Sequence, residues 1–109
     1  MRISELAEKA GLTAMNDYPD REVEGVYISD MVSDIITSAK RNSVLVTLQT
    51  HKSLVAAANL VAAAMIVVVK GRQPSDDVVE LATRTGIALF VSDLDTWAFA
   101  RKLTQLGFD

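Results

Sequence analysis

The chain has 109 residues, of which 50% are hydrophobic and 23% are charged, and its net charge is −3 at pH 7. This length and composition predict one globular domain spanning residues 1–109, and the acidic balance argues against general nucleic-acid binding. The chain has no cysteine and one histidine, which excludes disulfides, thiolate catalysis and a multi-histidine metal site within one chain.

The first predicted element is a short helix, because apolar residues recur at helical spacing from Ile3 to Ala10. Ser4 is its expected N-cap and Gly11 its expected end. The next residues, Leu12–Met15, are a candidate edge strand.

A turn is predicted over Asn16–Asp20, followed by a strand over Val23–Ile28. Within this strand, Gly25 is expected to mark a bulge or a close approach of the backbone. Asp20 and Arg21 are expected to form an ion pair that fixes the turn.

Ser29 and Asp30 are expected to open the next helix, as N-cap and as a favourable charge at the positive end of the helix dipole. This helix is predicted to cover one sheet face and to end near Lys40–Asn42. Its expected apolar stripe comprises Met31, Val32, Ile35, Ile36 and Ala39.

Two short apolar runs, Val44–Leu48 and Met65–Val69, predict central strands that are buried on both faces. The alanine-rich segment between them, Leu54–Ala64, predicts a helix. A strand, a helix and a second strand over this length predict a parallel strand pair.

The helix predicted over Leu54–Ala64 lacks a charged face, which indicates burial on more than one side. In a domain of this size, a second subunit is the expected cover, and small alanines would let its backbone approach. We therefore expect a homodimer with this helix at or near the interface. The expected interface residues are Ala57, Ala58, Leu60, Val61 and Ala64.

A further helix is predicted from Ser75 to Gly86, then a strand over Ile87–Val91 and a last helix over Trp97–Leu106. Trp97 and Phe99 are expected in the core or at an interface. The order of elements, an initial helix, an edge strand and four strand–helix units, predicts an α/β fold with a mostly parallel sheet of four or five strands.

Polar residues follow the ends of the predicted parallel strands, where open α/β sheets bind ligands. Seven of them form the candidate ligand-binding site: Gln49, Thr50, His51, Gly71, Arg72, Ser92 and Thr96.

Each of these residues also has a structural interpretation. His51 can bond a ligand or cap the alanine-rich helix, and Arg72 can grip an anion or lie solvated in its loop. Asp95 or Thr96 can serve as N-cap of the last helix. Asp93 and Asp95 are two residues apart in a loop, a spacing that does not make carboxylates converge as in a hydrolase.

The run from Asp20 to Asp30, DREVEGVYISD, resembles the segment for which DRTGG domains are named. Three later segments agree with that family: Val46–His51, the strand that ends at Gly71 before Pro74, and Gly86–Leu89 leading to Ser92, Asp95 and Thr96. The motif residues are Asp20, Arg21, Gly25, Ser29 and Asp30. Glu22 and Val23 replace the family threonine and its neighbour, which argues against a role for that hydroxyl.

The resemblance implies a three-layer α/β/α sandwich, similar to the amino-terminal domain of HPr kinase/phosphorylase. It further implies a regulatory or ligand-sensing module rather than an enzyme. The phosphate-binding loop of the kinase belongs to another domain, and no such motif occurs here.

Two functions are therefore expected alternatives. The first is a sensor that binds a nucleotide or phosphorylated metabolite at the strand ends, and the second is a ligand-free homodimeric scaffold for another protein. We expect no cofactor, no metal and no membrane contact. The amino-terminal residues lack the apolar core of a signal peptide, which favours a cytoplasmic location.

Overall fold

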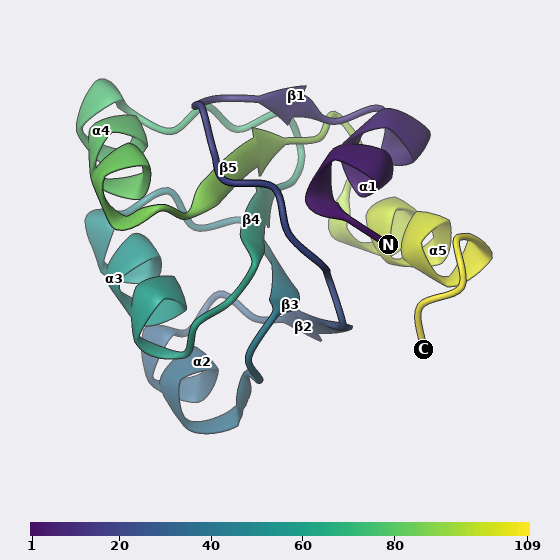
Figure 1. Ribbon diagram of the computed structural model, residues 1–109, viewed down its shortest axis with the longest axis horizontal. Coiled ribbons are helices and arrows are strands. Elements are labelled where there is room, and N and C mark those ends of the chain that lie inside the picture. Colours follow the sequence, from purple (N-terminus) through teal and green to yellow (C-terminus); the bar gives the residue numbers. More distant parts are fainter.

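Five strands form one sheet at the centre of the computed structural model, which describes residues 1–109 (Figure 1). The strands β2, β3, β4 and β5 run parallel, and β1 joins the edge antiparallel to β5. Across the sheet the order is β1 (Thr13–Ala14), β5 (Ala88–Val91), β4 (Met65–Val68), β3 (Ser43–Thr47) and β2 (Gly25–Ile28).

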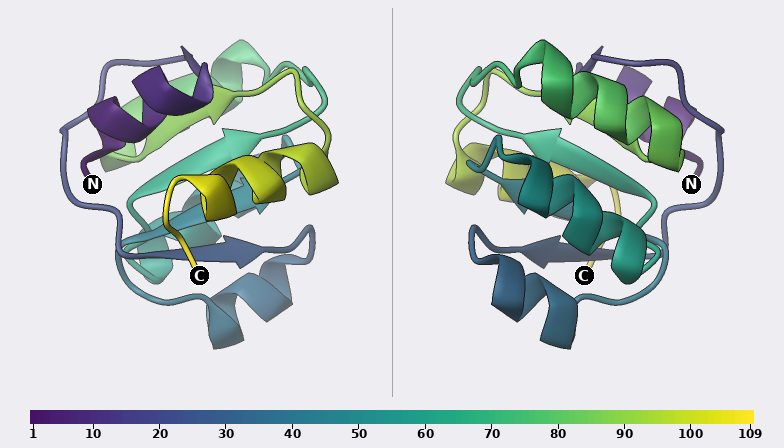
Figure 2. Two further views of the ribbon diagram at one scale, coloured as in Figure 1. Left: turned by 90° about the vertical axis from the view of Figure 1, so that its right-hand side faces the viewer. Right: turned by 90° about the vertical axis from the view of Figure 1, so that its left-hand side faces the viewer.

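Helices cover both faces of this sheet, as Figures 1 and 2 show. The helices α1 (Ile3–Ala10) and α5 (Thr96–Gln105) lie on one face. On the other face lie α2 (Val32–Ser38), α3 (Lys52–Leu60) and α4 (Asp76–Thr85). The predicted three-layer sandwich with a mostly parallel sheet is thus confirmed.

The core consists of two apolar clusters, one on each side of the sheet. Every residue of β3, β4 and β5 is buried, which confirms that the uninterrupted apolar runs are strands with helices on both faces. No helix is long and apolar enough to span a membrane.

Glycine predicted two helix ends correctly, whereas serine was a poor guide to helix starts. Gly11 and Gly86 follow α1 and α4 with φ angles of 66° and 72°, in the left-handed region that glycine adopts without strain. Ser4 lies inside α1, and Ser29 lies two residues before Met31, which occupies the N-cap position of α2. Ser75 is at the N-cap of α4, but its side chain makes no capping bond.

The helix α2 begins two residues later than we expected, because Asp30 bonds to the sheet instead of the helix. A carboxylate oxygen of Asp30 accepts hydrogen bonds from the Thr47 hydroxyl (2.9 Å) and the Leu48 N–H (2.7 Å). Ile35 alone of the expected stripe is buried, whereas Met31 is 63% exposed and Ile36 is 43% exposed.

The helix α3 ends at Leu60, four residues earlier than predicted, because Ala62 adopts a left-handed turn with a φ of 56°. Ala57, Ala58 and Ala64 are buried within this chain, so they present no surface to a partner, and our expectation for them is wrong. Of the other two expected interface residues, Leu60 is exposed and Val61 is half-buried.

Two further expectations concern single residues. Gly25 has no positive φ, and a Cβ built on it meets no atom within 4 Å, so the backbone there is neither bulged nor closely approached. Trp97 is exposed on α5, outside the core that contains Phe99. The first helical turn of α5 therefore carries a large apolar side chain at the surface.

Candidate functional site

The parallel strands end at one edge of the sheet, and the loops after β3 and β4 form a cavity there of about 250 Å³. We call it the strand-end cavity. Four of the seven predicted ligand-binding residues line it, together with two that we had not assigned to the site. The lining residues are Asp30, Leu48, Gln49, Thr50, His51 and Arg72.

One wall of the strand-end cavity is fixed by Asp30, whose carboxylate holds the beginning of the loop after β3. Thr47, which is buried, donates its hydroxyl hydrogen to Asp30 and accepts a hydrogen bond from the Gln49 N–H (3.0 Å). Gln49 and Thr50 therefore extend from a backbone that side-chain hydrogen bonds hold in place. Sequence reasoning missed this role because it explained Asp30 as part of a helix start.

Another part of the lining has positive character. His51 occupies the N-cap position of α3 without a side-chain capping bond, and the first turn of α3 has no acidic residue. The N–H groups at a helix start carry a partial positive charge. Arg72 is exposed and has no ion-pair partner in the chain, whereas Lys52 lies 3.8 Å from Asp77. An anion in the cavity would meet the α3 terminus and the free guanidinium.

The other three predicted residues lie outside the strand-end cavity. The Gly71 N–H donates to the Ser92 carbonyl (2.8 Å), and Ser92 is buried with its hydroxyl accepting from the Leu94 N–H (3.2 Å). Thr96 is the first residue of α5, and its neighbour Asp95 is the N-cap, accepting from the Ala98 N–H at 2.8 Å. The side chains of Ser92 and Asp95 are thus already engaged in hydrogen bonds to nearby backbone N–H groups.

The Asp20–Arg21 pair also has a different role from the one we expected. The two side chains do not bond to each other. Asp20 accepts hydrogen bonds from Ser4 and pairs with Arg2, which lowers the pKa of its carboxyl, chiefly through the Ser4 hydroxyl. Arg21 donates to the carbonyls of the turn before β4. Both residues fix the fold at the ends of the strands opposite the cavity.

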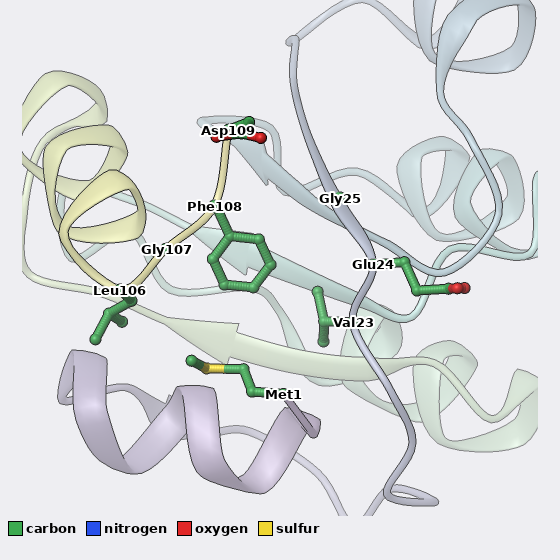
Figure 3. A pocket seen from close by; sticks show the side chains of 8 residues that line it. All are labelled: Met1, Val23, Glu24, Gly25, Leu106, Gly107, Phe108 and Asp109. Carbon is green, nitrogen blue, oxygen red and sulfur yellow. The ribbon is translucent and has the colours of Figure 1, made fainter.

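Elsewhere, three more cavities lie around β2 and the carboxyl terminus, one of which is shown in Figure 3. None contains a residue of the predicted ligand-binding site. No group of three or more histidine and acidic residues is placed to hold a metal ion.

Comparisons with known proteins agree with the fold. The family model of the DRTGG domain matches residues 3–106. A similar solved structure contains the CBS and DRTGG domains of the regulatory region of Clostridium perfringens pyrophosphatase, complexed with its activator, diadenosine tetraphosphate. The TM-score is 0.74 at 15% sequence identity, and the match covers 94% of this chain but 46% of that one. None of the curated proteins matches this sequence.

Proposed function

The chain belongs to the DRTGG domain family, and from this premise we propose that it is a regulatory module that senses a small phosphorylated ligand in the strand-end cavity. The observation that carries the proposal is that His51 and Arg72, from loops after two different strands, line one cavity with Gln49 and Thr50. Carboxyl ends of parallel strands are the usual ligand sites of open α/β sheets.

The chemistry of the cavity favours an anion. Arg72 can bind two phosphate oxygens through its planar guanidinium, and the uncapped N–H groups of α3 offer further donors. Gln49 and Thr50 can bond to the sugar or other polar part of a ligand. Asp30 is already engaged by Thr47 and Leu48, so its charge is partly compensated.

The size of the cavity limits the ligand. Its volume of about 250 Å³ is below the roughly 300–1,000 Å³ of pockets that enclose drug-sized molecules. The cavity therefore suits a phosphate group and its immediate neighbours, with the rest of a nucleotide or metabolite lying on the open side.

A regulatory role is supported by the neighbouring structure. Its DRTGG domain is part of a regulatory region, and that region was found with a nucleotide activator. In this chain, a ligand that bridges Arg72 and the start of α3 would favour the conformation in which the two loops are closest. A change at this edge of the sheet would then alter a surface that another protein or domain contacts.

The test is a thermal-shift screen of the purified chain against inorganic phosphate, mononucleotides and phosphorylated sugars. A ligand at one hundred times its dissociation constant should stabilise the chain by about 2.7 kcal/mol. Arg72→Ala should abolish this shift, and His51→Ala should reduce it. Arg84→Ala is the matched control, because Arg84 is exposed in the last turn of α4, which ends at the opposite edge of the sheet.

An equal loss of the shift in Arg84→Ala would mean that binding is only electrostatic attraction to the surface. A screen without any shift would contradict the sensor.

The alternative is a scaffold that binds another protein and no small ligand. It is favoured by Trp97, which is 72% exposed, since aromatic side chains dominate the energetics of protein interfaces. The two functions differ in one measurement: Trp97→Ala should abolish partner binding if the chain is a scaffold, whereas it should leave a ligand-induced thermal shift unchanged if the chain is a sensor. A cytoplasmic location and similarity to the HPr kinase amino-terminal domain stay predictions.

A further inference from the structure

We propose that Asp30 determines which ligand the strand-end cavity binds, by accepting a hydrogen bond from a sugar hydroxyl. The ligand would then be a sugar phosphate, such as the ribose phosphate part of a nucleotide, and not a phosphate group alone. Arg72 would bind the phosphate and Asp30 the sugar. This inference rests on the function proposed above, because it assigns a class of ligand to the same cavity.

The first observation is that one carboxylate oxygen of Asp30 has no partner in the chain. The hydrogen bonds from the Thr47 hydroxyl and the Leu48 N–H both end at Oδ1, and Oδ2 accepts none. No basic nitrogen lies within 4.0 Å of this carboxylate. An ionised carboxylate has about four acceptor positions, so Asp30 retains acceptor capacity while it lines the cavity.

The second observation is that the fold holds Asp30 in place from both sides. The Ser29 N–H donates to the Val46 carbonyl (3.2 Å), and the Met31 N–H donates to the Ser29 hydroxyl oxygen (3.1 Å). Thr47, which donates to Oδ1, is itself only 1% exposed. The position of Oδ2 is therefore set before a ligand arrives, and a preorganised acceptor loses little conformational freedom on binding.

The third observation is that Asp30 and Arg72 line the same cavity without pairing with each other. A phosphate group alone would satisfy the guanidinium and be repelled by the carboxylate. A ligand that has an anionic group at one end and a hydrogen-bond donor at the other would satisfy both. The separated charges therefore favour a ligand with two chemically different ends.

The rest of the lining favours hydroxyl groups as the donors. The side chains of Gln49 and Thr50 are neutral, and each can both donate and accept hydrogen bonds, as a sugar hydroxyl does. An ammonium group can only donate, so it would leave the donors of these two side chains without an acceptor. Carboxylates bind ribose hydroxyls in this way in dinucleotide-binding folds.

The experiment compares the dissociation constants of ribose 5-phosphate and methyl phosphate, measured by titration calorimetry. Both probes are phosphate monoesters, but only the first has sugar hydroxyls. The wild-type chain should bind ribose 5-phosphate more tightly by at least about tenfold, the ratio expected from one hydrogen bond to a charged group. Phosphoethanolamine, which carries an ammonium group instead of hydroxyls, should bind less tightly than ribose 5-phosphate.

Asp30→Asn separates the sugar contact from the structural role of this residue. The amide oxygen can still accept the bonds from Thr47 and Leu48, while an NH₂ group takes the place of Oδ2. The affinity for ribose 5-phosphate should fall about tenfold. The affinity for methyl phosphate should stay the same or rise, because a negative charge near the phosphate is removed. A purely structural defect would weaken both probes equally.

Asp17→Asn is the matched control, because it removes the same charge at a distant exposed position. Asp17 follows Asn16, which bonds to the Ile87 carbonyl beside the amino end of β5. Neither affinity should change in this variant. Circular dichroism reports whether Asp30→Asn is folded. If it is not, the carboxyl ¹³C signal of Asp30 in the wild-type chain provides the test: it should shift with ribose 5-phosphate and much less with methyl phosphate.

Equal affinities of the wild-type chain for the two probes, both lost in Arg72→Ala, would overturn this inference and leave the sensor intact. So would an equal weakening of both probes by Asp30→Asn, an unchanged ¹³C signal with bound ribose 5-phosphate, or tighter binding of phosphoethanolamine. A chain that binds neither these probes nor any compound of the thermal-shift screen would contradict the sensor itself.

Discussion

A single guanidinium, that of Arg21, ties the segment before β2 to the turn between α3 and β4. Its Nη2 donates to the carbonyls of Ala62 and Ala63, and Ala62 has a left-handed backbone with a φ of 56°. The turn leads directly into Ala64 and Met65, which are buried. Arg21 therefore satisfies carbonyl groups at the point where the chain enters the core.

Arg21→Ala is expected to lower the free energy of unfolding by about 1–3 kcal/mol, because it leaves partly buried carbonyls without their charged donor. Arg101→Ala, at an exposed position on α5, is the matched control and should change the stability by less than about 0.5 kcal/mol. Urea denaturation of both variants provides the measurement. Equal effects in the two would show that Arg21 acts through general charge alone.

The Asp20 carboxylate makes the stability of the folded protein depend on pH in the acidic range. Its pKa is lowered below the ordinary 3.8, first by the Ser4 hydroxyl and then by the Ser4 N–H. A lowered folded-state pKa means that the interaction stabilises the protein above the ordinary value. The stabilisation is lost as the pH falls below 3.8 and through the lowered pKa.

Ser4→Ala is therefore expected to be less stable than the wild type at neutral pH and to approach it below pH 3.8. Unfolding by urea at a series of pH values measures the difference. Ser53→Ala is the control, because Ser53 is exposed and its hydroxyl makes no side-chain hydrogen bond; it should show no such convergence. A difference that is the same at every pH would contradict the assignment to Asp20.

At the scale of elements, α3 shows how one face of an apolar helix can be buried within its own chain. Ala57 and Ala58 are 2% and 0% exposed, and they belong to the cluster between the sheet and the helices α2 and α4. On the outer side, Ala56, Asn59 and Leu60 are exposed. Ala57 and Ala58 allow close contact with the chain's own strands and helices.

Ala57→Leu should accordingly destabilise the chain by about 1–3 kcal/mol, because three extra carbons do not fit into a filled core. Its mass should not change. Ala56→Leu adds the same atoms on the exposed side of the same helix and should change stability by less than about 0.5 kcal/mol. Denaturation and light scattering on the two variants distinguish burial of Ala57 within the chain from a position at a subunit interface. A halved mass for Ala57→Leu with unchanged stability would show that α3 is an interface after all.

Elements were predictable from sequence where local signals and burial agreed. The apolar runs of β3 and β4 and the glycines after α1 and α4 each have one physical interpretation, and their positions were correct within one or two residues. The start of α2 had two possible physical interpretations, because Asp30 can bond to a helix terminus or to a neighbouring loop. The choice depended on Thr47, which lies 17 residues away in sequence.

Across the whole molecule, Asn16 connects the amino-terminal segment to the last strand. Its Nδ2 donates to the Ile87 carbonyl and its Oδ1 accepts from the Leu89 N–H, both at 2.9 Å. These residues are more than 70 positions apart in sequence. The Asn16 side chain makes hydrogen bonds to β5 of the kind that a neighbouring strand would make, and it fixes β1 at the edge of the sheet.

Asn16→Ala is expected to cost about 1–3 kcal/mol, since it removes both bonds and leaves the buried Leu89 amide without an acceptor. Exchange of the Leu89 amide with solvent should become faster in the variant. Asn59→Ala is the matched control, because Asn59 is exposed on α3 and its side chain makes no hydrogen bond within the chain. Unchanged exchange at Leu89 would mean that β1 is held by other contacts.

The sequence by itself determined the fold class, the central strands, most helices and the position of polar residues at the strand ends. Those features depend on hydrophobic periodicity and on the conformational freedom of glycine, which act over a few neighbouring residues. Tertiary structure alone decided that His51 and Arg72 share a cavity with Asp30, while Ser92 is turned inward and buried. It also decided which apolar surfaces stay exposed, because burial depends on the packing of elements that are distant in sequence.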